Sequence, residues 1–320
     1  MENPSFLYRP RVLNSSNYNI RYKGSSGGVI TEVMKYLFST NQIKSSISFK
    51  FSSTELFKPF LINNYSDYNQ IGSIYHDVNI FKFLKKNIKN IKSPILITCL
   101  PCQIVPLKRL LSSNNIETFF ISLVCSSQLS KEATYYFLNK NNIKLKEIDE
   151  FQYRGNGWPS GIHIKTKKQD YFFHNNTSKW KYIFHSQVFT LNRCFSCKDT
   201  FGLKADISIA DPWINRYVKS EKIGSSIVVT HTIFGENLIN EMLLAKILTL
   251  EEFLTQKEVI NSQKYTLIKK DIYLKNKNII KFFIHIFKKK SYKNNFYYFA
   301  KLHHWFFRKL IKILTKKGNK

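Results

Sequence analysis

The chain has 320 residues, of which 43% are hydrophobic and 15% aromatic, so it can bury a sizeable core and is not an intrinsically disordered protein. Its 50 Lys and Arg against 21 Asp and Glu give a formal net charge of +29, which points to an anionic partner: a membrane surface, a nucleic acid or a phosphorylated substrate. Abundant Lys, Asn and Ile are also compatible with an AT-biased genome as the source of part of this charge.

Two targeting features are not predicted. Residues 1–6 show no basic region followed by an apolar core, so the sequence predicts no signal peptide. No window approaches the ~18–20 uninterrupted apolar residues of a membrane-spanning helix. We therefore expect a cytoplasmic protein whose five cysteines are free thiols or metal ligands rather than disulfides.

The first motif is a Gly/Ser turn at residues 24–28, directly before a helical pattern at 29–38. Apolar residues recur there at the helical period, so the turn lies at a helix N-terminus. Glycines let the backbone approach a phosphate closely, and the N–H groups of a helix end favour an anion. A simple N-cap with flexible glycines is the alternative.

Residues 45–93 contain predicted elements but no predicted chemistry. Apolar and polar residues alternate at 45–51, which predicts a half-buried strand, and 71–75 is a second short candidate. The pattern at 78–91 predicts an amphipathic helix with lysines on its outer face.

From Pro94 onwards, predicted strands alternate with helices. Strands are predicted at 95–98 and 119–124, and helices at 103–111 and 131–139. Ser130 is expected to cap the second helix. This order implies a parallel strand pair, so Cys102 and Cys125, which follow the two strands, can face one site at the carboxyl edge of the sheet. Two buried core thiols are the alternative.

Residues 148–230 are predicted to be β-rich. Short strands are predicted at 148–153, 162–165, 170–173, 207–210 and 226–230. Between them lies the loop 154–161, Arg-Gly-Asn-Gly-Trp-Pro-Ser-Gly. A guanidinium beside flexible backbone suits a phosphate, and the indole of Trp158 offers a stacking plane. A tight turn with a packing tryptophan is the alternative.

A Cys-x-x-Cys pair, Cys194 and Cys197, follows in the same region. With Cys102 and Cys125 it makes four thiolates, the number that a [4Fe-4S] cluster takes. Zinc would accept the same four, although all-cysteine zinc sites usually come as two Cys-x-x-Cys knuckles. Cys99 is the natural spare, and the spacing leaves open an exchange of Cys99 for Cys102.

The tail at 264–320 has 17 Lys and Arg against a single acid, Asp271, and so supplies over half of the net charge. Its apolar residues at helical spacing, flanked by basic and aromatic residues, are typical of a helix in an anionic membrane surface, where each basic residue contributes about 1 kcal/mol. Helix packing and nucleic-acid binding are the alternatives, but no nucleic-acid partner is expected because no such motif is present. The stripe is Phe296, Phe299, Leu302, Phe306, Leu310 and Ile313, beside Tyr297, Tyr298, Lys301, Trp305, Arg308, Lys309, Lys312 and Lys316.

These patterns together predict an α/β (α+β) fold, with a mixed sheet, flanking helices, a β-rich second half and a basic amphipathic C-terminal helical tail. We divide the chain into an N-terminal part with the Gly/Ser turn at 1–93, a core at 94–263 and the tail at 264–320.

Six ordered motifs resemble the beta subunits of coenzyme F420-reducing hydrogenase and related dehydrogenases. The resemblance runs from about residue 24 to about residue 264 and rests on the shared order of short motifs. They are Ser25-Ser26-Gly27-Gly28, Leu100-Pro101-Cys102-Gln103, Val124-Cys125, Arg154-Gly155-Asn156-Gly157-Trp158-Pro159, Arg193-Cys194-x-x-Cys197-x-Asp199, and Ala205-Asp206-Ile207-Ser208 leading to Asp211-x-Trp213.

The resemblance implies an FAD and a [4Fe-4S] cluster that pass electrons between a deazaflavin or similar hydride carrier and a partner protein or substrate. It implies that the cluster ligands are Cys102, Cys125, Cys194 and Cys197. It implies flavin contacts from Ser25, Ser26, Gly27, Gly28, Gln103, Arg154, Gly155, Asn156 and Trp158.

The chain departs from the family pattern in three places. The family commonly has Thr-Pro-Cys-Gln where this chain has Leu100 first, and His-Gly after the second cysteine where this chain has Ser126 and Ser127. The second change leaves the preference for a hydride carrier open. A ferredoxin-like segment with repeated cysteines is also missing, so the expected electron partner is F420, NAD(P)H or a separate ferredoxin-like protein.

We therefore expect a flavin- and iron-sulfur-dependent oxidoreductase at the inner face of the membrane. Short family members of this type also occur in bacterial surface-polysaccharide gene sets, which suits the basic tail. The alternative is a non-catalytic membrane-surface interaction protein with a structural four-cysteine zinc site. No acid or base is assigned, because Asp199, Asp211 and His163 are equally suited to structural roles.

Overall fold

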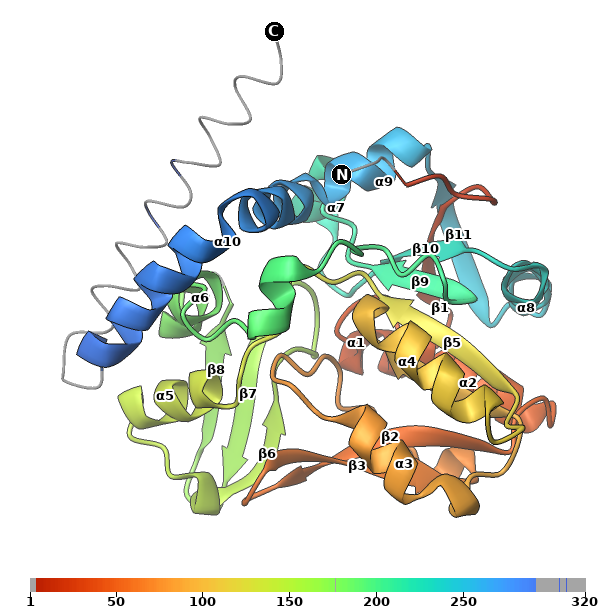
Figure 1. Ribbon diagram of the computed structural model, residues 1–320. Helices are drawn as coiled ribbons and strands as arrows, with labels where there is room; N and C mark the ends of the chain where they lie inside the picture. Colours follow the sequence, from red (N-terminus) through yellow and green to blue (C-terminus); the bar gives the residue numbers. More distant parts are fainter. Residues whose placement is uncertain (1–3, 176, 292–304, 306–308, 310–320) are drawn as a thin grey trace, which may run out of the picture.

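The computed structural model describes residues 4–175, 177–291, 305 and 309, and its strands form two sheets in that part of the chain (Figure 1). The large sheet has eight strands, in the spatial order β11 (Leu248–Phe253), β1 (Arg11–Ser15), β10 (Ser226–Thr230), β9 (Ile207–Ala210), β5 (Thr118–Leu123), β4 (Ile95–Cys99), β2 (Ser45–Ser52) and β3 (Leu56–Ile62). The small sheet has three, in the order β6 (Ile148–Gln152), β7 (Gly161–Thr166) and β8 (Asp170–His174).

Helices cover both sheets (Figure 1). In the described residues they are α1 (Tyr18–Lys23), α2 (Val29–Ser39), α3 (Ile80–Lys86), α4 (Pro101–Ser112), α5 (Glu132–Lys140), α6 (Lys179–His185), α7 (Asn215–Ser220), α8 (Ile233–Leu244), α9 (Gln256–Ser262) and α10 (Lys264–Ser291). Short 3-10 turns are η1 (Tyr65–Asp67), η2 (Ile88–Asn90), η3 (Leu145–Glu147) and η4 (Asn192–Ser196). The predicted α/β class with a mixed sheet is confirmed.

The middle of the large sheet is parallel. β2, β4, β5 and β9 pair in parallel, whereas β3, β10, β1 and β11 add antiparallel partners at the two ends. The predicted parallel pair β4–β5 is thus confirmed, and the carboxyl ends of β4, β5 and β9 meet at one edge. The sheet takes strands from both the 1–93 and the 94–263 segments.

Side-chain alternation along the parallel strands builds a core on each face of the sheet. Leu96 and Ile121 join one buried cluster with residues of α2 and α8, while Ile97 and Phe120 join another with residues of α3 and α4. Both faces of these strands are therefore covered, which explains why their sequences are nearly continuous apolar runs. The small sheet has its own aromatic core with α5 and α6, centred on Phe137, Tyr153 and Trp180.

Four local predictions are corrected by the structure. Residues 71–75 form no strand; only an isolated bridge joins His76 to Leu129. The helix predicted at 78–91 is divided into α3 and η2, because Asn87 turns its amide back onto the carbonyl of Phe83. Lys131, not Ser130, occupies the N-cap of α5. The region 1–23, without a predicted element, contains β1 and α1.

α10 is a long helix with non-helical backbone angles at Asn276 (φ −123°, ψ 26°), where its two parts join. Within the described residues, no helix combines the length and the apolar character needed to cross a bilayer. The amphipathic stripe predicted from Phe296 to Ile313 lies outside the described residues, apart from its neighbours Trp305 and Lys309.

Candidate functional site

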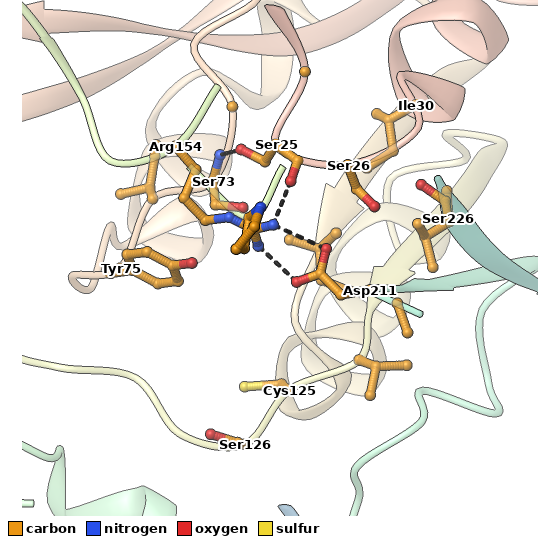
Figure 2. Close-up of a pocket in the computed structure, with 18 of the residues that line it drawn as sticks. Ser25, Ser26, Ile30, Ser73, Tyr75, Cys125, Ser126, Arg154, Asp211 and Ser226 are labelled. Atoms are coloured by element: carbon orange, nitrogen blue, oxygen red, sulfur yellow. Dashed lines mark hydrogen bonds and ion pairs between the residues drawn. The ribbon is translucent and has the colours of Figure 1, made fainter. Parts of the chain in front are cut away.

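A cavity of about 700 Å³ opens at the carboxyl edge of the parallel strands. Thr98 of β4, Leu123 of β5 and Ile209 of β9 form part of its wall. This volume lies within the ~300–1,000 Å³ range of small-molecule and cofactor sites. Further wall residues come from the Gly/Ser turn, residues 68–75, residues 123–128, α6, and residues 261–266 (Figure 2).

The Gly/Ser turn forms one side of this cavity. Ser25, Ser26 and Gly28 line it, and Gly28 (φ +77°) is the N-cap of α2, as the sequence predicts. The Ser25 hydroxyl accepts a hydrogen bond from the Ser73 N–H at 2.7 Å (Figure 2). Gly27 does not line the cavity, because its N–H donates to Ser226 Oγ and a Cβ there would lie 2.6 Å from the Leu13 carbonyl.

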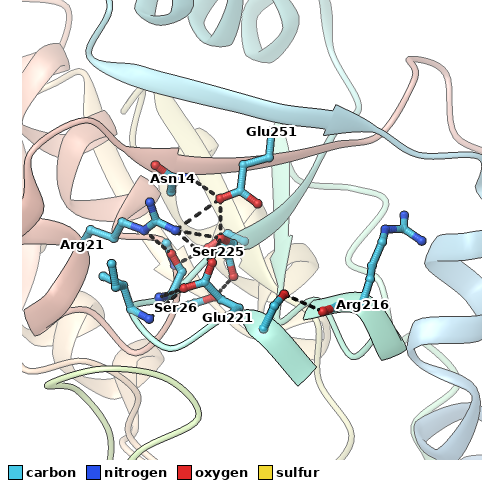
Figure 3. A network of polar contacts seen from close by, with 12 residues as sticks. Asn14, Arg21, Ser26, Arg216, Glu221, Ser225 and Glu251 are labelled. Carbon is cyan, nitrogen blue, oxygen red and sulfur yellow. Dashed lines mark hydrogen bonds and ion pairs between the residues drawn. The ribbon is translucent and has the colours of Figure 1, made fainter. Parts of the chain in front are cut away.

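A polar network behind the turn fixes its position (Figure 3). Arg21 donates to the Gly224 carbonyl at 2.7 Å, to Glu221 at 3.0 Å and to Glu251 at 3.2 Å. The Ser26 hydroxyl donates to the Ser225 carbonyl at 2.5 Å. Burial alone would raise the pKa of Glu221, but backbone N–H donors from Gly224 and Ile223, together with Arg21, lower it. The carboxylate of Glu221 therefore links α1, through Arg21, to residues 221–226, and the Ser26 hydroxyl links the Gly/Ser turn to the same residues.

Arg154 and Asp211 form a buried ion pair in the cavity wall (Figure 2). The Arg154 guanidinium donates to the two Asp211 oxygens at 2.6 and 3.0 Å and also to the Ser25 carbonyl. Burial alone would lower the pKa of Arg154, but Asp211 and Tyr75 raise it. The charge that the sequence suggested for a phosphate is therefore balanced within the protein.

The rest of the 154–161 loop supports this pair. Trp158 is only 3% exposed, and its indole N–H donates to Asp211 at 3.2 Å. Gly155 (φ +139°) and Asn156 (φ 58°) adopt left-handed backbone angles, and a Cβ on Gly155 would lie 2.7 Å from the Lys23 carbonyl. Neither of these residues nor Trp158 lines the cavity, whereas the exposed aromatic residues Trp213 and Tyr265 do.

Four cysteines surround a second, small cavity of about 10 Å³. Cys102 lies in the first turn of α4, Cys125 directly after β5, Cys194 in η4 and Cys197 just after it. Cys194 Sγ accepts a hydrogen bond from the Gln128 N–H at 3.4 Å, and Cys197 Sγ lies 3.3 Å from the Asp199 carbonyl. The structure thus brings these four predicted residues to one cavity.

Cys99 lies apart from this group. It is 3% exposed in the core between β4, α3 and α4, and burial raises its pKa to about 12. The structure therefore places Cys102, and not Cys99, at the small cavity.

Burial and hydrogen bonding shift the pKa values of the four thiols in different directions. Burial raises the pKa of Cys125 to about 11 and also raises the pKa of Cys194. A hydrogen bond between Cys102 and Cys197 lowers the pKa of Cys197 to about 6 and raises that of Cys102.

The comparisons with known proteins agree with this arrangement. The family models of the coenzyme F420 hydrogenase/dehydrogenase beta subunit match residues 13–85 with the N-terminal part and residues 93–256 with the C-terminal part. The chain belongs to this family. It is therefore a redox protein of the hydrogenase/dehydrogenase beta-subunit type.

A solved structure shows the same fold. The chain is similar to a chain of the F420-reducing [NiFe] hydrogenase complex from Methanosarcina barkeri, with a TM-score of 0.63 and 15% identity over 85% of this chain and 93% of that chain. No curated protein matches the sequence significantly.

The donor set of this beta subunit-like chain can be tested against a metal centre. In the described part of the chain, no three His, Cys, Asp or Glu side chains are grouped so that they could hold one metal ion. The thiolates of a [4Fe-4S] cluster bind different irons, so they do not need to share an ion. Four convergent cysteines match that donor set, and the thiols must move apart from their present small cavity to admit a cluster.

Several residues at the two cavities were not predicted from the sequence. Ser73 and Tyr75 line the large cavity from a segment without predicted chemistry, and burial raises the pKa of Tyr75. Lys269 and Lys270 of α10 reach the cysteine region, although the sequence assigned their segment to the membrane. Gln103 lines neither cavity; its side chain accepts from the Leu100 N–H at 2.9 Å and caps α4.

Proposed function

We propose that this chain is an FAD- and [4Fe-4S]-dependent oxidoreductase that transfers electrons between a hydride carrier of the F420 or NAD(P)H type and a partner protein or substrate. One observation carries the proposal: residues 125–128 line both the large cavity and the cysteine cavity. A single segment thus separates two candidate cofactor sites, which suits direct electron transfer between them.

The large cavity offers the groups that a flavin dinucleotide needs. The first turn of α2 and the Gly/Ser turn supply backbone N–H donors for phosphate groups. Trp213, 45% exposed, offers a ring face in the same wall. Bound FAD would supply the conversion of a two-electron hydride transfer into single-electron steps. The Arg154–Asp211 pair joins the 154–161 loop to Ser25 and to the residue that follows β9.

A [4Fe-4S] cluster suits the cysteine arrangement better than structural zinc does. All-cysteine zinc sites usually come as two Cys-x-x-Cys knuckles, whereas here Cys102 and Cys125 arrive singly, one in the first turn of α4 and one directly after β5. Four thiolates are the number that such a cluster takes.

The test is the cofactor content of protein purified without oxygen. The proposal predicts FAD together with about four irons and about four sulfides per chain. Zinc without flavin would support the interaction-protein alternative. A colourless, iron-free protein after reconstitution with iron and sulfide would contradict the proposal.

We further propose that residues 264–320 hold the protein at the anionic inner surface of the membrane, where its substrate belongs to surface-polysaccharide assembly. The segment's 17 basic residues against one acid support this location. Binding to vesicles that contain anionic lipid should be strong at low salt and fall as salt screens the charges. Equal binding to uncharged vesicles would contradict this part of the proposal.

A further inference from the structure

α10 brings two ammonium groups to the cysteine site from outside the segments that the family models match. Lys269 Nζ donates to the hydroxyls of Ser126 and Ser127 at 2.7 and 2.9 Å. Lys270 Nζ lies 3.6 Å from Cys197 Sγ and also donates to the Asp199 carbonyl. One lysine therefore holds the wall between the two cavities, and the other contacts a thiol of the cysteine group.

Apolar packing fixes α10 in this register. Phe195, which lies between the two cysteines of the Cys-x-x-Cys pair, packs against Tyr273 with ring centroids 4.8 Å apart and joins Ile272 and Ile280 in one buried cluster. The Tyr273 hydroxyl also contacts Gln187. A displacement of the Cys-x-x-Cys segment would therefore displace α10, and a displacement of α10 would displace the Cys-x-x-Cys segment.

The two lysines, Lys270 buried and Lys269 half-buried, have no carboxylate partner among the described residues. Lys270 is 1% exposed, and no hydrogen-bond partner of either lysine in the described part of the chain is a carboxylate. The other cation at this cavity, Arg193, is paired with Asp77 at 2.5 Å. Burial of an ammonium without a counter-ion is costly, so the site is arranged for an anion that these side chains do not themselves supply.

A [4Fe-4S] cluster on four thiolates is such an anion. With four thiolates it would be a dianion when its core is 2+ and a trianion when its core is 1+. A nearby fixed ammonium stabilises the trianion more than the dianion, because the attraction grows with charge. Fixed positive charge beside the cluster therefore raises its reduction potential.

We propose that Lys269 and Lys270 are positioning residues that dock α10 onto the cluster and raise its reduction potential, an inference that rests on the proposed function. The cluster in turn would supply a counter-charge for the buried Lys270 and the half-buried Lys269. It would therefore strengthen the docking of α10 that the apolar packing provides.

The first test measures the reduction potential of the cluster in the full-length, anaerobically purified protein by an EPR-monitored redox titration. Lys269→Met and Lys270→Met should each shift the potential to more negative values, and Lys270→Arg should retain most of the wild-type value. Lys275→Met is the matched control, because Lys275 lies on the same helix, is 71% exposed and pairs with Asp271. An unchanged potential in both Met variants would overturn the proposal.

The second test needs no variant. Hydrogen exchange of residues 264–280 should be slower in cluster-loaded wild-type protein than in the same protein after removal of iron, while exchange in α8 should not change. Equal exchange of 264–280 in both forms would overturn the docking role even where the Met variants fail to fold. Wild-type protein that holds no iron would overturn the proposed function as well, whereas a loaded cluster with neither effect would overturn this inference alone.

Discussion

The two cavities that meet at residues 125–128 differ in how their charges are balanced. In the large cavity, Arg154 is neutralised by Asp211 and braced by Ser25. At the cysteines, Lys269 and Lys270 contact hydroxyls, a thiol and a carbonyl, with no carboxylate partner in the described residues. The charge of Arg154 is therefore balanced within the large cavity. The ammonium groups at the cysteines have no carboxylate partner in the described residues, so that site is suited to receive an anionic group.

The supports of the two sites also differ in their place along the chain. The large cavity is braced by the Gly/Ser turn, by residues 221–226 and by the Arg154 loop, which all lie inside the matched regions 13–85 and 93–256. The cysteine site is completed by α10, which begins at Lys264. Changes outside the shared residues 125–128 and the start of α10 should therefore leave the other site measurably intact.

The largest effect is expected from removal of a cluster ligand. Cys125→Ser or Cys194→Ser should reduce iron from about four per chain to nearly none, because each thiolate holds a different iron. FAD should remain bound in Cys194→Ser, because Cys194 does not line the large cavity and the Arg154 charge there is balanced by Asp211. Iron, sulfide and flavin assays measure both outcomes.

Cys99→Ser is the control for this experiment. Its thiol is buried in the core and faces neither cavity, so iron content should stay at the wild-type value. If Cys99→Ser lost its iron while Cys125→Ser kept its iron, Cys99 rather than Cys125 would be a ligand, which would contradict the assignment.

Removal of Arg154 should have the next largest effect. Arg154→Met leaves the Asp211 carboxylate buried without its partner, which should cost about 3–5 kcal/mol of folding free energy. FAD affinity should fall as well, because Ser25 loses a contact. Lys165→Met, which breaks the exposed pair with Glu150, is the control and should cost less than ~1 kcal/mol.

Denaturant unfolding measures these changes. The double variant Arg154→Met with Asp211→Leu should recover part of the loss, because no unpaired charge remains. A double variant that is as unstable as the sum of its two single variants would contradict the pairing.

A smaller effect is expected at Gly72. It has φ +70°, and a Cβ there would lie 2.4 Å from Ser25 Oγ, so Gly72→Ala should cost about 1–3 kcal/mol and weaken FAD binding without loss of iron. In the control Gly24→Ala, φ is −67° and the nearest atoms would lie 3.2 Å away, so the cost should be clearly lower. Isothermal titration with FAD and denaturant unfolding compare the two.

At neutral pH the smallest effect is expected at His76, whose contribution is a loss of stability in mild acid. Burial lowers the pKa of His76 to about 4, and His231 shows the same shift. Between pH 6.5 and 4 the unfolded chain binds a proton that native His76 does not, so stability falls with falling pH, by up to about 3 kcal/mol for this group. His76→Gln should show a shallower dependence of unfolding free energy on pH; an unchanged slope would contradict the assignment.

The central sheet could be predicted because its evidence is local. Apolar runs at 95–98 and 119–124, separated by a helical pattern, imply a parallel pair, and that pairing places Cys102 and Cys125 on one edge. The Cys-x-x-Cys spacing likewise indicated the second half of the donor set. The strand pairing follows from period alone, whereas the assignment of the four cysteines to one ligand set also rested on the resemblance to the beta-subunit family.

The features that the sequence did not predict depend on contacts between residues that lie far apart in the chain. The partner of Arg154 lies 57 positions away, and Ser73 is fixed by Ser25 in a segment with no regular period. Lys269 and Lys270 occur in a run of lysines that predicts a solvated or membrane-facing surface, and only the packing of Tyr273 on Phe195 turns them inwards. Sequence periodicity does not reveal such long-range pairing.

The most direct test of the account is an anaerobic titration of the full-length protein with reduced F420, NADH or NADPH, followed by visible absorption and EPR. The account predicts that one of these donors bleaches the flavin absorption and produces the EPR signal of a reduced [4Fe-4S] cluster, and that Cys194→Ser retains the bleaching but loses the EPR signal. A protein that contains zinc and no flavin, or one in which the flavin is reduced while a bound cluster never accepts an electron, would contradict it.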